Sequence, residues 1–133
     1  MLRCSPELAL RLGLGSMYLY SGYGLFMNPK GWTWAVPWWF AGVIKTYFSL
    51  ESYLMLQGVV EFLFAIILLL WFLPKKLVFM VSIISAAELL FILLFAPQFF
   101  ITFRDLGVLG ASVALVLILL KEIKASAPNG TVS

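Results

Sequence analysis

The sequence predicts an all-α integral membrane protein, a bundle of four transmembrane helices with a tryptophan-rich interfacial segment between the first and second spans. Hydrophobic residues make up 63% of the 133 residues and charged residues only 11%, which does not fit a soluble protein. The apolar residues form four long runs, and about 20 such residues in a helix cross the hydrocarbon core of a bilayer. We therefore expect a single membrane domain over residues 1–125 and a disordered tail over residues 126–133.

The first span is predicted over residues 6–27. Pro6 suits a first helical turn and Ser5 can cap it, while the Asn-Pro-Lys-Gly segment at 28–31 ends the helix. A signal peptide is the alternative interpretation, but no small-x-small cleavage site stands out, so we expect a retained span. Arg11 lies near one end of this helix, where its long side chain is expected to extend to the membrane surface.

Residues 30–52, between the first and second spans, hold four of the chain's five tryptophans. Indole rings prefer the headgroup level of a membrane, and Pro37 interrupts the segment, so a short helix after Pro37 is expected to lie across one end of the bundle. Two interpretations stay open, an aromatic belt and a lid over a site for a lipophilic ligand. For the second, the ligand-pocket candidates are Tyr18, Tyr23, Trp34, Trp38 and Trp39.

The second, third and fourth spans are predicted over residues 53–73, 77–96 and 98–120. Glu61 is the only ionisable residue of the second span, and Glu88 is the only one of the third. Short segments that contain proline separate the three spans.

Positive charge predicts the orientation of these spans. One group of basic residues falls on the side of both termini: Arg3, Lys75, Lys76, Lys121 and Lys124. Only Lys30 and Lys45 fall on the other side. By the positive-inside rule, the protein is a multi-pass protein of the cell (inner or cytoplasmic) membrane with both termini in the cytoplasm.

Glu61, Glu88 and Arg104 are expected at one depth, roughly 10–13 Å from the outer ends of their helices. A carboxylate at that depth is costly unless it has a partner, so we predict that Arg104 neutralises one or both glutamates. Two acids beside one arginine are unbalanced. Either one carboxyl group keeps a proton, or a cation or ligand joins the set. The predicted network comprises Glu61, Glu88, Arg104, Asp105, Gln57 and Tyr20.

Two roles for this network stay open. It either fixes only the register and orientation of the helices, or it provides a proton path or the polar anchor of a ligand site. Gly58, one residue after Gln57, is expected to let another helix come close.

Several kinds of chemistry are excluded by composition. The chain has no histidine, and its only cysteine is Cys4. This excludes an intrachain disulfide, a Cys/His zinc site, a His-ligated haem and a Ser-His or Cys-His nucleophile, so no metal site and no intrinsic cofactor are expected. The net charge of +3 is spread along the chain, and nucleic acid is therefore not an expected partner.

Five different short motifs follow one another along the chain: Arg11-Leu12-Gly13-Leu14-Gly15, Tyr20-Ser21-Gly22, Asn28-Pro29, Gly58-Val59-Val60-Glu61, and Arg104-Asp105-Leu106 with Gly110. In this order the chain resembles the DoxX/DoxD-like family of small four-span membrane proteins, over roughly residues 11–120. One departure is that the family often has a lysine soon after the glycine that ends the first span, whereas the first lysine here is Lys30.

The resemblance implies a four-helix membrane bundle associated with membrane redox chemistry. DoxD-type members are subunits of a thiosulfate:quinone oxidoreductase, and DoxX-type members join oxidoreductase assemblies. The resemblance also implies that Glu61, Arg104 and Asp105 occupy the polar positions of the family.

Three functions follow as hypotheses. The first is a membrane subunit that binds a quinone or a similar lipophile, with Glu61 or Glu88 handling protons; it would be an enzyme only as the membrane subunit of a quinone-linked oxidoreductase. The second is a non-catalytic accessory subunit of a larger membrane complex. The third is a small proton-coupled carrier, for which four spans are few unless the chain dimerises. The expected partners are the lipid bilayer and either other membrane subunits or a second copy, for which the small residues are Gly107, Gly110, Ala111 and Ala114.

Overall fold

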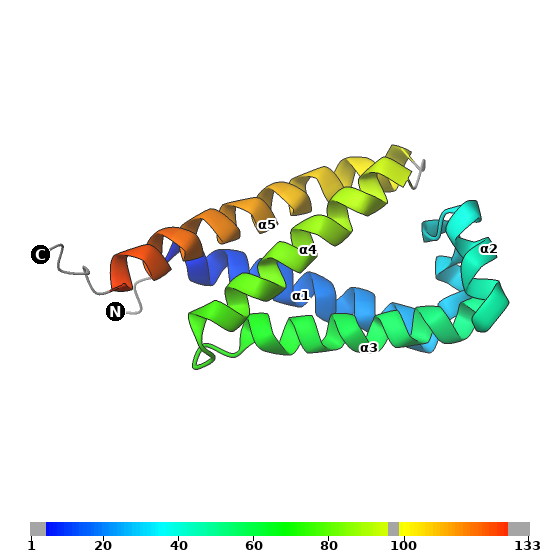
Figure 1. Ribbon diagram of the computed structural model, residues 1–133, viewed down its shortest axis with the longest axis horizontal. Coiled ribbons are helices and arrows are strands. Elements are labelled where there is room, and N and C mark those ends of the chain that lie inside the picture. The colour runs from blue at the N-terminus through cyan, green and yellow to red at the C-terminus, as the bar shows by residue number, and fades with distance from the viewer. Residues whose placement is uncertain (1–4, 96–98, 128–133) are drawn as a thin grey trace, which may run out of the picture.

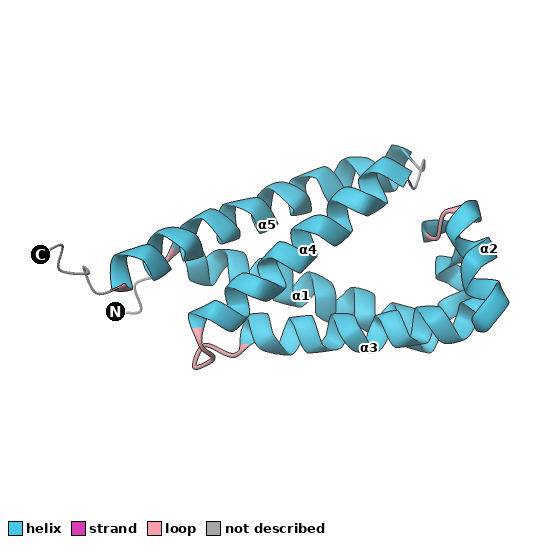
Figure 2. Ribbon diagram, viewed as in Figure 1, coloured by secondary structure: helices cyan, strands magenta, loops and turns pink. Residues whose placement is uncertain are grey.

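The computed structural model describes residues 5–95 and 99–127, and of residues 99–104 the backbone alone. The regular structure of this described chain is entirely helical, without a strand (Figure 2). Its elements in order are α1 (Pro6–Met27), the 3-10 helix η1 (Pro29–Ala35), α2 (Trp38–Tyr47), α3 (Leu50–Leu69), α4 (Lys75–Phe95) and α5 (Phe99–Ser126). Arg3, Cys4 and most of the tail predicted to be disordered lie outside the described residues.

The four long helices form two pairs, α1 with α3 and α4 with α5 (Figure 1). The pairs meet at the end of the molecule where α1 begins, where α3 turns into α4 and where α5 ends. They diverge toward the other end, where η1 and α2 lie against the α1–α3 pair.

Helix bounds follow local caps. The Ser5 side chain accepts a hydrogen bond from the Leu8 N–H at 3.2 Å, which starts α1 where the sequence predicts. Ser49 caps α3 in the same way, accepting from the Ser52 N–H at 3.1 Å, so α3 begins at Leu50, three residues before the predicted start. It also ends earlier than predicted, at Leu69, before the proline-containing turn.

Three helices of the described chain are long and apolar enough to cross a membrane. They are Leu50–Leu69, Lys75–Phe95 and Asp105–Ser126. These helices support the prediction of a membrane protein. The remaining long helix, α1, has 22 residues but carries Glu7, Arg11 and several glycines and tyrosines, which lower its hydropathy.

The core lies where the two pairs meet. Its buried residues are Leu14, Tyr18, Phe64, Ala65, Leu68, Val78, Val81, Leu115 and Leu119. Within the first pair, α1 and α3 cross at Gly22 and Gly58, and this is the close approach that the sequence predicts for Gly58.

Arg11 does not extend away from the bundle as expected, because it is buried against the end of α3. Only 6% of the residue is exposed. Its guanidinium donates to the Leu68 carbonyl oxygen at 2.9 Å and to the Leu70 carbonyl oxygen at 2.6 Å, and it pairs with Glu7 at 3.2 Å. The last carbonyls of a helix have no partner within the helix, so Arg11 satisfies the C-terminal end of α3.

Candidate functional site

A cavity of about 810 Å³ lies between the two helix pairs, under η1 and the start of α2. Side chains from every helix of the described chain contribute to its wall, and most of them are apolar. A small number of polar groups converge within it, which is the usual composition of a small-molecule site. Tyr20 lines the cavity and is also 76% exposed, so the cavity reaches the outside of the bundle.

Aromatic rings form the part of the cavity near η1 and α2. Trp32 and Trp34 of η1 are stacked, with ring centroids 6.1 Å apart. Phe40 of α2 makes edge contacts with Tyr53 of α3 at 5.7 Å and with Phe91 of α4 at 6.2 Å. These rings join the two helix pairs across the cavity and offer flat faces to a ring-shaped ligand.

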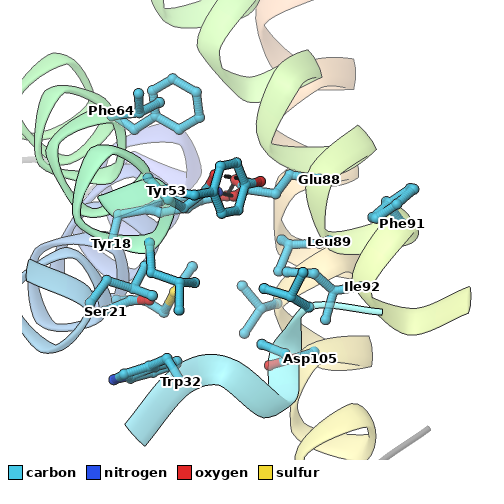
Figure 3. Close-up of a pocket in the computed structure, with 18 of the residues that line it drawn as sticks. Tyr18, Ser21, Trp32, Tyr53, Phe64, Glu88, Leu89, Phe91, Ile92 and Asp105 are labelled. Carbon is cyan, nitrogen blue, oxygen red and sulfur yellow. Dashed lines mark hydrogen bonds between the residues drawn. The ribbon is translucent and has the colours of Figure 1, made fainter. Parts of the chain in front are cut away.

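Polar side chains meet next to these rings, on the side of Tyr53 where its hydroxyl lies. Gln57 of α3 donates from Nε2 to Oε1 of Glu88 on α4. The Tyr18 hydroxyl donates to Oε2 of Glu88 at 3.3 Å and lies 2.6 Å from the Ser85 hydroxyl. Tyr53 donates to Oε1 of Gln57 at 3.4 Å. Figure 3 shows Glu88 reaching from α4 toward Tyr18 and Tyr53 on the opposite helix pair.

Glu61 lies behind this polar group, at the contact between α1 and α3. It is 6% exposed, and its carboxyl group interacts with the side chains of Ser21 and Gln57. Its Oε2 atom is buried without a hydrogen-bond partner among the described residues. The Gln57 amide therefore lies between two carboxyl groups, that of Glu61 and that of Glu88.

The residues proposed from the sequence take different places around the cavity. Those that line it are Tyr18, Tyr20, Trp34, Gln57, Glu88 and Asp105. Tyr23 and Trp38 are exposed and stay outside the cavity wall, while Trp39 packs its ring on Phe91 and Phe95 of α4. The side chain of Arg104 lies outside the described part of the chain, and so does its predicted ion pair.

Other lining residues do not stand out in the sequence. Trp32, Phe40, Tyr53 and Phe91 all contribute rings to the cavity. Trp32 and Phe40 belong to the tryptophan-rich segment, but nothing in that segment shows which rings turn inward. Tyr53 and Phe91 lie within predicted spans, and nothing in the sequence distinguishes them from the other large side chains of those spans.

The cavity wall thus combines flat aromatic faces with a small group of hydrogen-bonding side chains. Within the described residues, no group of three or more His, Cys, Asp or Glu side chains gathers to hold a metal ion. Comparison of the chain with protein-family models, with curated proteins and with solved structures found no significant match.

Proposed function

We propose that the protein is a four-span membrane protein of the DoxX/DoxD type that binds a quinone-like lipophile between its two helix pairs. The observation that carries this proposal is the cavity itself, aromatic at one part and polar at Gln57 and Glu88. Its volume of about 810 Å³ falls within the range of roughly 300–1,000 Å³ typical of small-molecule sites.

The fourth span of this proposal is α1. Its 22 residues span roughly 33 Å at 1.5 Å per residue, enough for the hydrocarbon core. Its charged residues, Glu7 and Arg11, lie near one end and pair with each other, and Arg11 is also bonded to carbonyls of α3. These charges are therefore compensated, which lowers the cost of placing α1 in a bilayer.

The orientation follows from the charge at the end where α1 begins and α5 finishes. Lys75 and Lys76 at the start of α4 and Lys121 and Lys124 near the end of α5 all lie toward this end. By the positive-inside rule this end faces the cytoplasm, and the cavity lies toward the outer side of the membrane.

The class of ligand is inferred from the aromatic side chains and the polar side chains of the cavity wall. The stacked Trp32 and Trp34 and the edge-on Phe40 and Phe91 suit a flat ring with an apolar tail. Glu88 is placed to exchange hydrogen bonds, and in a reaction protons, with the polar head of that ring. The chain's composition supplies no electron carrier, so electrons would come from another subunit of a membrane redox complex.

The test fills the cavity with one large side chain. Val60 of α3 lines the cavity, whereas its neighbour Val59 does not, so Val60→Trp and Val59→Trp differ only in the side of the helix that they change. Each protein is purified in mild detergent, its bound lipophiles are identified by mass spectrometry, and binding of an alkyl quinone is measured.

We expect wild type and Val59→Trp to retain the lipophile and Val60→Trp to lose at least about tenfold in affinity, which corresponds to roughly 1.4 kcal/mol. Equal binding by wild type and Val60→Trp would exclude the cavity as the binding site.

A second candidate function, that of an accessory subunit in a larger membrane complex, is favoured by one face of α5. Gly107 and Gly110 lie there with open space beside them, because a Cβ on either would meet no atom within 4 Å. Such a face lets a partner helix pack closely. In this case Gly110→Trp would release partner subunits from the purified complex while leaving lipophile binding unchanged.

A further inference from the structure

Among the described residues, the acceptor oxygens of Glu88 in the polar part of the cavity outnumber the donors that reach them. Glu88 presents two carboxylate oxygens to the described side chains, and both act as acceptors, one from Gln57 and one from Tyr18. Each carboxylate oxygen can accept about two hydrogen bonds, so Glu88 retains capacity for further donors.

The described side-chain donors directly beside Glu88 already have partners within the protein. The Tyr53 hydroxyl donates to Gln57, whose amide lies between Glu88 and Glu61. The hydroxyl of Tyr18 bonds to Glu88 and to Ser85, and Ser85 in turn lies 3.1 Å from the Ser112 hydroxyl.

Glu61, which does not line the cavity, also has fewer donors than its oxygens can accept from among the described side chains. It is almost fully buried, and yet its Oε2 atom has no donor among the described side chains. A buried acceptor without a partner is costly, because it has lost its hydrogen bonds to water and gained none within the protein. The described side chains around Gln57 therefore leave at least one oxygen of the two glutamates without a donor.

We infer that this cavity selects a ligand whose head group donates hydrogen bonds, and that among quinone-like lipophiles it binds the hydroquinone in preference to the quinone. The inference rests on the proposed function, because it names the chemical form that the same cavity takes. It goes beyond that function, because the size and aromatic lining of the cavity fit both forms equally.

The physical reason is the match of donors to acceptors. A hydroquinone hydroxyl can donate to a Glu88 oxygen, and this hydrogen bond replaces one that the hydroxyl makes with water. A quinone carbonyl can only accept, so at the same place it would lose its hydration and oppose the carboxylate oxygen. A site built around such a bond discriminates strongly against the analogue that lacks the hydroxyl.

This preference would affect the redox behaviour of the bound ligand. A site that binds the reduced form more tightly raises the two-electron reduction potential of its ligand. Each tenfold preference for the hydroquinone over the quinone raises this reduction potential by about 30 mV. The cavity would then hold the reduced lipophile until a stronger oxidant takes its electrons.

The experiment compares three probes with one ring and one alkyl tail: the hydroquinone, the quinone and the hydroquinone dimethyl ether. Binding to the full chain in lipid nanodiscs is measured by calorimetry without oxygen. The ether separates hydrogen-bond donation from redox chemistry, because it keeps the shape of the reduced ring but has no hydroxyl proton. We expect the hydroquinone to bind at least about tenfold more tightly than either other probe.

Two variants and a control identify the acceptor. Glu88→Gln replaces one carboxylate oxygen by a donor and should bring the three affinities to within about threefold of one another. Tyr18→Phe removes a protein donor to Glu88 and should leave the preference for the hydroquinone intact or larger. Glu51→Gln makes the same chemical change at an exposed glutamate that pairs with Lys30, and it should behave as wild type.

The outcomes separate this inference from the proposed function. If all three probes bind wild type with equal affinity, or if the quinone binds most tightly, the inference is wrong and the ligand site stands. If none of the probes binds wild type, both the ligand site and its preference are wrong. A preference that survives in Glu88→Gln, with the variant folded by circular dichroism, would also overturn the assignment to Glu88.

Discussion

Gly58 of α3 lies so close to Gly22 of α1 that a Cβ built on Gly58 would stand 2.8 Å from the Gly22 carbonyl oxygen. The same holds in reverse, because a Cβ on Gly22 would stand 2.8 Å from the Gly58 carbonyl oxygen. Both obstacles are backbone atoms and cannot rotate away. This crossing brings α1 against α3 at the level of Glu61, whose own Cβ is 3.2 Å from the position of a Cβ on Gly22.

Replacing Gly58 by alanine should therefore destabilise the bundle by about 1–3 kcal/mol, because the helices must separate to admit the methyl group. The matched control is Gly107→Ala on α5, where a Cβ meets nothing within 4 Å and alanine favours helix by up to about 1 kcal/mol. Unfolding in mixed detergent micelles measures both. Equal stabilities for the two variants would contradict the close crossing.

The second prediction concerns Arg11, which satisfies the carbonyl oxygens of Leu68 and Leu70 at the end of α3. Arg11→Met should destabilise the protein by about 2–4 kcal/mol, because these carbonyls and the Glu7 carboxylate lose their donor. Arg11→Lys should recover only part of this loss, since one ammonium group cannot reproduce the fork of the guanidinium.

The control for Arg11 is Lys76→Met, which removes an exposed positive charge at the start of α4. The free energy of unfolding is measured for the three variants under one set of conditions. A loss in Lys76→Met as large as that in Arg11→Met would show that net charge, and not the helix-end contacts, matters at this end of the bundle.

The case of Arg11 also shows where prediction from sequence stops. Composition and the lengths of the apolar runs are sufficient to predict an all-helical membrane protein, because both depend on local properties of the chain. The contact between Arg11 and the end of α3 joins residues 57 positions apart. Nothing near Arg11 indicates which helix end it will meet, so its long side chain fits an exposed position equally well.

In the candidate site, too, the sequence does not predict which side of a helix faces the cavity. Helix rise predicts that Tyr20 lies at the depth of Glu61 and Glu88, but rise gives no information about direction around the axis. Tyr18 and Tyr20 are two residues apart, which is about 200° around a helix. In the structure Tyr18 is buried and bonded to Glu88, whereas Tyr20 is 76% exposed.

The third prediction uses this pair of tyrosines. Tyr18→Phe should cost about 1–2 kcal/mol of stability, because the hydroxyl bonds to Ser85 and Glu88 are lost while the ring keeps its edge contact with Phe64. Tyr20→Phe removes the same hydroxyl from an exposed position and should change stability by less than about 0.5 kcal/mol. Thermal unfolding in detergent compares them. Equal effects would mean that the hydroxyl of Tyr18 does not stabilise the contact between the helix pairs.

The fourth prediction concerns the helix α2, which reaches α4 through aromatic rings. The Trp39 ring lies 6.1 Å from Phe91 and 5.5 Å from Phe95, both on α4, while Trp38 beside it is 87% exposed. Each such ring pair contributes about 0.5–1.5 kcal/mol beyond the area that it buries. Trp39→Ala should therefore release α2 from α4 and open the cavity beneath Phe40.

Hydrogen exchange of the α2 amides measures this release. In Trp39→Ala we expect exchange to accelerate on the order of tenfold, while Trp38→Ala, which removes an equal ring from the exposed side, should leave it nearly unchanged. If lipophile binding also weakens in Trp39→Ala alone, α2 acts as a cover for the bound ligand. If both variants accelerate exchange equally, the two tryptophans act only as anchors at the membrane surface, and the contacts with Phe91 and Phe95 do not hold α2 in place.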